Sequence, residues 1–107
     1  MKKVYLLVFI LIAFGTQANA SFETRVVSKI ILHDAGSILI ELKGGIITSE
    51  NCTNALLILK PSSQHYKEMY AAILSAYHSG SKISGWVNTC DTRFNYPVLT
   101  RLDLLEK

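Results

Sequence analysis

The stretch from residue 61 to residue 80, PSSQHYKEMYAAILSAYHSG, constrains the fold most, because its apolar residues recur at helical spacing. The residues at positions i, i+3, i+4, i+7, i+8 and i+11 form one stripe of an α-helix and are Tyr66, Met69, Tyr70, Ile73, Leu74 and Tyr77. We expect Ser62 or Ser63 to cap the first turn and Gly80 to end the helix in a left-handed conformation. A helix with so wide an apolar face must cover other elements of the chain.

The segments on both sides of this helix have the composition of β-strands. Residues 25–32 and 38–42 are rich in β-branched and other apolar residues, and the turn between them contains Asp34 and Gly36, which favour a hairpin. Three further strands are predicted at residues 55–59, 82–88 and 98–105. The order β-β-β-α-β-β is the connectivity of the OB-fold, a small five-stranded Greek-key barrel. A helix packed on an open five-stranded sheet is the alternative architecture.

The N-terminal residues 1–20 have the layout of a secretory signal peptide. Lys2 and Lys3 precede an apolar run at residues 4–14, and Ala18-Asn19-Ala20 supplies the small residues of a cleavage site. The run is shorter than the roughly 20 residues that a spanning helix needs. We therefore expect a bacterial protein, secreted or periplasmic, with one domain at residues 21–107 and no stable membrane span. An uncleaved anchor is the alternative.

The charge balance argues against nucleic acid as a partner. The chain has 11 lysines and arginines against 8 aspartates and glutamates. Without Lys2 and Lys3 the basic residues number 9, and the formal net charge falls from +3 to +1. Single-stranded nucleic acid binds along a basic track with exposed stacking aromatics, whereas the helix tyrosines are expected to face the core.

The chain has two cysteines, Cys52 and Cys90. An exported chain meets an oxidising compartment, and an even number of cysteines leaves no odd thiol, so the pair predicts a disulfide. Such a bridge stabilises the fold by about 3–4 kcal/mol in the chain-entropy model. A reactive or metal-binding pair is the alternative, but the spacing is not C-x-x-C and no histidine lies nearby.

No catalytic, cofactor or metal site emerges from the remaining polar residues. The histidines fall in a turn, at a helix start and at a helix end, and are His33, His65 and His78. No spacing brings two carboxylates together for acid–base work, and solvated charges are expected at Asp34, Glu41, Asp91 and Asp103. We therefore expect a protein that is not an enzyme.

Several short motifs in the second half of the chain resemble a known family. They are YAAILSAYHSG at residues 70–80, Lys82-Ile83, Val87-Asn88-Thr89-Cys90, Tyr96-Pro97-Val98 and Leu102. This pattern resembles the C-terminal half of proteins similar to the subtilase cytotoxin B subunit, which are small exported bacterial OB-fold proteins related to toxin B subunits. The resemblance implies a non-catalytic binding module for cell-surface glycans or glycoproteins, and a homo-oligomer, specifically a pentamer. A structural or interaction protein without glycan binding is the alternative function.

The candidate ligand site combines the resemblance with the strand pattern. The resemblance places a sugar site near the start of the first strand, where this chain has Glu23 and Thr24. In residues 82–88, alternation puts Ser84, Trp86 and Asn88 on the outer face. A tryptophan among hydrogen-bonding groups suits a sugar or a subunit interface, or it lies under Phe94 and Tyr96.

The last strand also predicts self-association. Its alternation places Leu99 and Leu105 on the outward side, although a small barrel has only one interior. These leucines would then need cover from a neighbouring copy.

Overall fold

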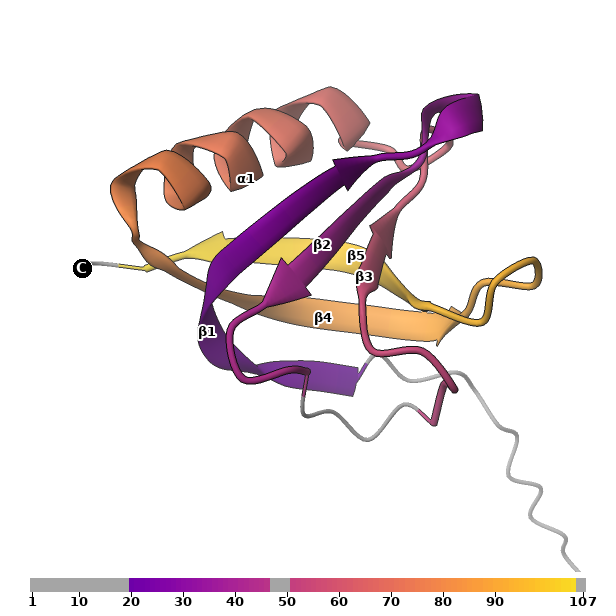
Figure 1. Cartoon of the computed structure of the whole chain (residues 1–107). Helices are drawn as coiled ribbons and strands as arrows, with labels where there is room; N and C mark the ends of the chain where they lie inside the picture. The colour runs from indigo at the N-terminus through magenta and orange to yellow at the C-terminus, as the bar shows by residue number, and fades with distance from the viewer. Residues whose placement is uncertain (1–19, 47–50, 106–107) are drawn as a thin grey trace, which may run out of the picture.

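The computed structural model describes residues 20–46 and 51–105, and it is mainly β with a single α-helix in that part of the chain. Residues 1–19, most of the predicted signal peptide, lie outside the described residues. The predicted order β-β-β-α-β-β is confirmed (Figure 1). The elements are β1 (Ala20–Leu32), the short 3-10 turn η1 (Asp34–Gly36), β2 (Ile38–Leu42), β3 (Leu57–Leu59), α1 (Tyr66–Ser79), β4 (Lys82–Cys90) and β5 (Pro97–Leu104).

The five strands are hydrogen-bonded in the order β1-β2-β3-β5-β4, and β4 pairs again with β1, so the order closes on itself. All pairs are antiparallel except β3 and β5, which run parallel where Ile58 lies beside Val98. The long strand β1 makes this closure by bending: its first half pairs with β4 and its second half with β2.

The start of β1 differs from the sequence prediction. The sequence predicts a strand from residue 25, whereas β1 begins at Ala20, and Ser21 lies opposite Trp86 of β4. The register shifts between Phe22 and Arg25, which interrupts the alternation that a sequence pattern detects. The ladder with β4 therefore orders a segment that has weak strand propensity.

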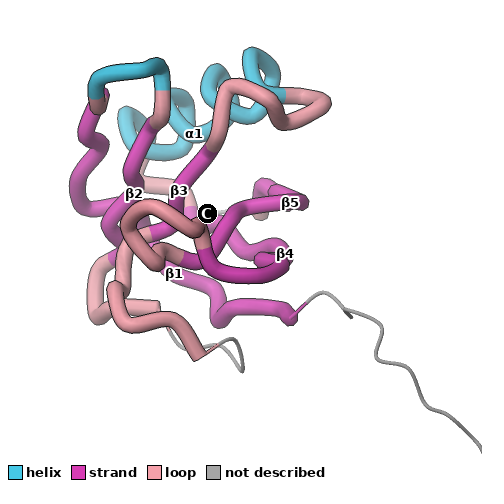
Figure 2. The backbone as a smooth tube through the Cα atoms, turned by 90° about the vertical axis from the view of Figure 1, so that its right-hand side faces the viewer, coloured by secondary structure: helices cyan, strands magenta, loops and turns pink. Residues whose placement is uncertain are grey.

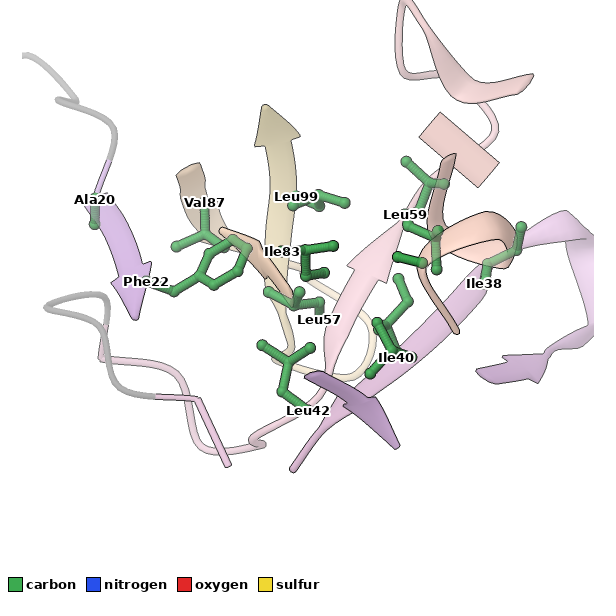
Figure 3. Close-up of a cluster of buried hydrophobic side chains, with 13 residues drawn as sticks. Ala20, Phe22, Ile38, Ile40, Leu42, Leu57, Leu59, Ile83, Val87 and Leu99 are labelled. Atoms are coloured by element: carbon green, nitrogen blue, oxygen red, sulfur yellow. The ribbon is translucent and has the colours of Figure 1, made fainter. Parts of the chain in front are cut away.

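The core lies inside the closed sheet and under the helix. Alternate residues of β2 point inward, as do Leu57 and Leu59 of β3, and Figure 3 shows their side chains gathered with Ile83, Val87 and Leu99. Burying one side chain of this size contributes roughly 1.5–3 kcal/mol, so these positions hold the sheet together.

The predicted outward orientation of Leu99 is wrong, because β5 contains a β-bulge. The sequence alternation puts Leu99 outside, but its side chain is 0% exposed and belongs to the core. Val87 pairs with Leu99 whereas the preceding Trp86 pairs with Arg101, so Thr100 is an extra residue on β5. One extra residue reverses the side-chain alternation, which lets both Leu99 and Leu102 face the core.

Helix α1 packs on β1 and β5 through a narrower face than its apolar stripe predicts (Figure 1). Ile73 and the small residue Ala76 are buried, and Tyr66, Met69 and Tyr70 are partly buried. Leu74 and Tyr77 remain exposed, at 40% and 48%, because the short strands cover only part of the stripe. The prediction that all the helix tyrosines face the core is therefore wrong for Tyr77.

The two ends of α1 are capped in different ways. Gly80 has φ 75°, in the left-handed region as predicted, and its N–H donates to the Ala76 carbonyl at 2.9 Å. The predicted serine cap is wrong, since His65 occupies the N-cap position and makes no side-chain cap bond. Ser63 contributes only its backbone carbonyl, which accepts from the Tyr66 N–H at 3.2 Å. Among the described residues, no helix has the length and apolar character needed to cross a membrane.

Candidate functional site

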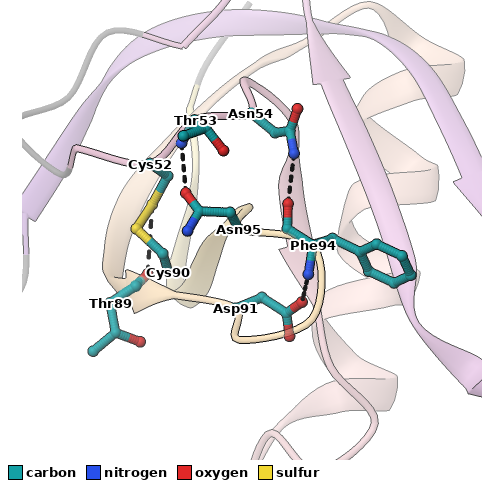
Figure 4. Close-up of a disulfide and its surroundings, with 8 residues drawn as sticks. All are labelled: Cys52, Thr53, Asn54, Thr89, Cys90, Asp91, Phe94 and Asn95. Carbon is teal, nitrogen blue, oxygen red and sulfur yellow. Dashed lines mark hydrogen bonds between the residues drawn. A yellow bond between two sulfur atoms is a disulfide. The ribbon is translucent and has the colours of Figure 1, made fainter.

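The predicted disulfide is confirmed. Cys52 and Cys90 are bridged, with 2.01 Å between the sulfur atoms and 5.6 Å between the Cα atoms (Figure 4). Two hydrogen bonds run beside the bridge: the Thr53 N–H donates to the Asn95 side chain, and the Asn54 amide donates to the Phe94 carbonyl. The segment before β3 is thus fastened to the loop between β4 and β5.

Asp91 organises that loop from within. One carboxylate oxygen accepts from the backbone N–H groups of Arg93 and Phe94, at 3.1 and 2.8 Å. The other oxygen lies 2.9 Å from the ammonium of Lys60. The Lys60 hydrogen bond, helped by the two backbone donors, lowers the pKa of Asp91 below its ordinary value of 3.8, although burial opposes this. Asp91 is 5% exposed, so the expectation of a solvated charge is wrong here.

Trp86 lies on the outer face of the sheet, where β4 runs between β1 and β5. Its side chain is 37% exposed, and its strand neighbours are Ser21 on β1 and Arg101 on β5. The guanidinium carbon of Arg101 lies 4.3 Å from the centre of the indole ring. Arg101, rather than Phe94 or Tyr96, therefore partly covers Trp86.

The other predicted ligand residues divide into two groups. Ser84 lies on β4 two residues before Trp86, and Glu23 and Thr24 are exposed on the neighbouring part of β1. Glu23 accepts from Arg25 at 3.1 Å. Asn88 is half buried near the end of β4, and its side-chain oxygen is buried without a hydrogen-bond partner among the described residues. The sheet thus gathers Ser84, Trp86 and Glu23 on one face, with Asn88 at its margin.

Arg101 is the member of this face that the sequence prediction did not select. It donates from Nε to Asp103 at 3.0 Å, which positions the guanidinium beside the Trp86 ring. An arginine near an aromatic residue is a recognised pairing, but the bulge at Thr100 decides which β5 residue lies opposite Trp86. Sequence spacing alone does not reveal that register.

The described part of the surface includes a groove and a pocket that Trp86 does not line, although Arg101 is among the walls of the groove. A groove of about 360 Å³ lies between α1 and β5, with Met69, Ala72, Leu102 and Leu104 among its walls. A second pocket, of about 290 Å³, lies where the β1–β2, β3–α1 and β4–β5 connections meet. We call it the loop-end pocket; its polar walls include Ser37, Lys60, Ser62, Asp91, Thr92 and Arg93, and its aromatic wall is Phe94.

The three histidines lie on different elements or connections. His33 contacts Asp34 and the edge of Phe94, His65 precedes α1, and His78 lies in the last turn of the helix. In residues 20–46 and 51–105, no three His, Cys, Asp or Glu side chains form a group that could hold a metal ion.

No model of a protein family, curated protein or solved structure matches the chain.

Proposed function

We propose that this chain is an exported, non-catalytic binding module with an OB-fold, resembling the B subunit of subtilase cytotoxin. The closed order β1-β2-β3-β5-β4, the parallel contact of β3 with β5 and the helix between β3 and β4 support an OB-type barrel. The Cys52–Cys90 bridge supports the proposal that the chain folds in an oxidising compartment.

The proposed ligand is a cell-surface glycan, and the observation that carries this proposal is the exposed Trp86 on the outer face. An indole ring offers an apolar surface for the C–H face of a sugar, while nearby polar groups fix the hydroxyls. Glu23, Thr24 and Ser84 supply such groups on the neighbouring strand positions. Arg101, stacked at 4.3 Å, adds hydrogen-bond donors at the edge of the ring.

A glycan array probed with the mature, oxidised protein tests this function. A lectin gives a coherent set of terminal sugars, and Trp86→Ala abolishes that signal. Tyr77→Ala is the matched control, because Tyr77 is also an exposed aromatic residue but lies on α1. No signal at high protein concentration, or an unchanged pattern for Trp86→Ala, would overturn the glycan assignment.

Export and cleavage are tested separately by the mass of the protein recovered from the periplasm or medium. Cleavage after Ala20 leaves Ser21 as the first residue, directly opposite Trp86. A mass that retains residues 1–20 contradicts the signal-peptide proposal and leaves the glycan test unaffected.

The second candidate function is an interaction protein that assembles with copies of itself. Its support is the exposure of four large apolar side chains, which is unusual in a small domain: Leu104 at the end of β5, Leu105 just after it, and Leu74 and Tyr77 on α1. Leu105 donates its N–H to the Lys82 carbonyl, so the end of β5 lies beside the start of β4.

Light scattering on the mature, oxidised protein tests self-association. The resemblance to toxin B subunits leads us to propose a pentamer. Leu104→Lys is expected to dissociate it, whereas Leu32→Lys changes an exposed leucine at the far end of β1 and serves as the control. A monomer at high concentration contradicts this candidate.

A further inference from the structure

We propose that the loop-end pocket is a second binding site, which takes a small polyhydroxylated molecule bearing one anionic group, such as a sugar acid or a hexose monophosphate. The pocket is built by three connections rather than by the middle of β4, and Trp86, Ser84, Glu23 and Arg101 are not among its lining residues. The inference therefore does not rest on the glycan proposal.

Among the described residues that line the pocket, cationic side chains outnumber anionic ones. Lys60 and Arg93 both line it, and Asp91 is its acidic residue. Asp91 is committed to Lys60 and to two backbone N–H groups. Among the described residues, no carboxylate forms an ion pair with Arg93, whose guanidinium lies 4.7 Å from the Phe94 ring centre. The pocket thus carries about one net positive charge, which favours an anion.

Lys60 also keeps hydrogen-bonding capacity for a ligand. An ammonium group has three donors, and Asp91 accounts for one of them at 2.9 Å. The Lys60 side chain is 37% exposed, so the remaining donors are accessible from the pocket. Lysine and arginine together suit carboxylate or phosphate oxygens, because charge-assisted hydrogen bonds are stronger than neutral ones.

The remaining walls suit a single polar ring. Ser37, Ser62 and Thr92 place hydroxyl groups around the pocket, and the Phe94 ring provides an apolar wall. The volume of about 290 Å³ is at the small end of ligand pockets, which begin at roughly 300 Å³. A monosaccharide-sized ligand is therefore a better match than an extended chain.

The walls are held in place before any ligand arrives. Tyr66 donates its hydroxyl hydrogen to the Gly36 carbonyl, which joins the β1–β2 turn to the first turn of α1. Asp91 and the Cys52–Cys90 bridge fix the loop on the opposite wall, as Figure 4 shows for the loop and the bridge. Figures 1 and 2 both have η1 on the same side of the molecule as α1. A preformed site binds more tightly, because little free energy is lost in ordering its loops.

Isothermal titration of the mature, oxidised protein tests the pocket with four probes: glucuronate, a hexose monophosphate, inorganic phosphate and glucose. We expect at least one of the two charged sugars to bind and uncharged glucose to bind at least about tenfold more weakly. Tighter binding of glucuronate would indicate that the pocket recognises a carboxylate. Tighter binding of the hexose monophosphate, with inorganic phosphate for comparison, would indicate a phosphate. Arg93→Gln should lower the affinity about tenfold, and Arg93→Lys should retain part of it.

Lys29→Gln is the control, because Lys29 is an exposed cation on the part of β1 that pairs with β2, and it lines neither the loop-end pocket nor the Trp86 face. It should leave these affinities unchanged. The proposal is overturned if neither charged sugar binds at millimolar concentration, if glucose binds as tightly as they do, or if Arg93→Gln binds like the unaltered protein. Thr92→Val provides a second variant in the pocket, should Arg93→Gln fold poorly, and must also weaken binding.

Discussion

Gly85 and Arg101 approach each other so closely that no side chain fits between their strands. A Cβ atom built on Gly85 would lie 1.9 Å from the Arg101 carbonyl oxygen and 2.9 Å from its carbonyl carbon. The contact arises beside the β5 bulge, where Gly85 pairs with Leu102 and Trp86 with Arg101. The bulge that brings Leu99 into the core therefore requires a glycine on the facing strand.

Replacing Gly85 with alanine is expected to lower the free energy of unfolding by about 1–3 kcal/mol, because the obstructing atoms belong to the backbone and cannot rotate away. Urea denaturation measures the change. Ser84→Ala, at the preceding position of β4, should alter stability far less. Equal stabilities for Gly85→Ala and the unaltered protein would contradict the close approach.

The ion pair between Asp91 and Lys60 leads us to expect that the free energy of unfolding falls in acid. Because the Lys60 hydrogen bond lowers the folded-state pKa of Asp91, the unfolded chain takes up the proton first as the pH falls. The stabilisation is complete above the ordinary pKa of 3.8 and is lost at lower pH, through the folded-state pKa. Denaturation measured from neutral to strongly acidic pH should show this decline.

Asp91→Asn should remove most of that acid dependence and destabilise the protein at neutral pH by about 1–3 kcal/mol, because an amide cannot accept all the bonds of the carboxylate. Asp103→Asn is the control, since Asp103 pairs with Arg101 on the surface. The attribution to Asp91 is wrong if both variants keep the acid dependence of the unaltered protein.

The double substitution Cys52→Ser with Cys90→Ser should lower the free energy of unfolding by about 3–4 kcal/mol, given the separation of 38 residues. Chemical denaturation with and without reductant gives the same comparison for the unaltered chain. The reductant should have no effect on the double variant, which has no other cysteines. Equal stability of the oxidised and reduced proteins would contradict the prediction.

Fluorescence reports on the Trp86 face, because Trp86 is the single tryptophan of the chain. Arg101 covers part of the ring, so Arg101→Ala should shift the emission to longer wavelength and make quenching by acrylamide more efficient. Arg93→Ala is the control, since Arg93 lies over Phe94 instead. An unchanged spectrum for Arg101→Ala would show that the arginine does not shield Trp86 in solution.

The element order could be predicted from the sequence because each element has a local signal. The apolar spacing of residues 66–77 predicted α1, and the boundaries of β2 at Ile38–Leu42 were predicted correctly. The disulfide was also predicted, from the even number of cysteines and the expectation of export. These features depend on residue composition and on residues close together in the sequence, both of which can be read from a single sequence.

What the sequence does not contain is the register between distant strands. The orientation of Leu99 depends on one extra residue at Thr100, and the strand start at Ala20 depends on pairing with β4. For the same reason Arg101 and the loop-end pocket could not be found, since their neighbours come from separate parts of the chain. The outer position of Trp86 could be predicted because β4 alternates regularly there.

The Cys52–Cys90 bridge also determines how the folded chain responds to a pulling force. Residues 52–90 contain β3, α1 and all of β4, and the bridge closes them into one covalent loop. Tension applied to the two ends passes through the sulfur atoms and bypasses the helix. Only the segments outside the loop, β1, β2 and β5, can be drawn out, so the maximum extension of the oxidised chain is much shorter than that of the reduced chain. The disulfide therefore sets a mechanical limit that reductant removes.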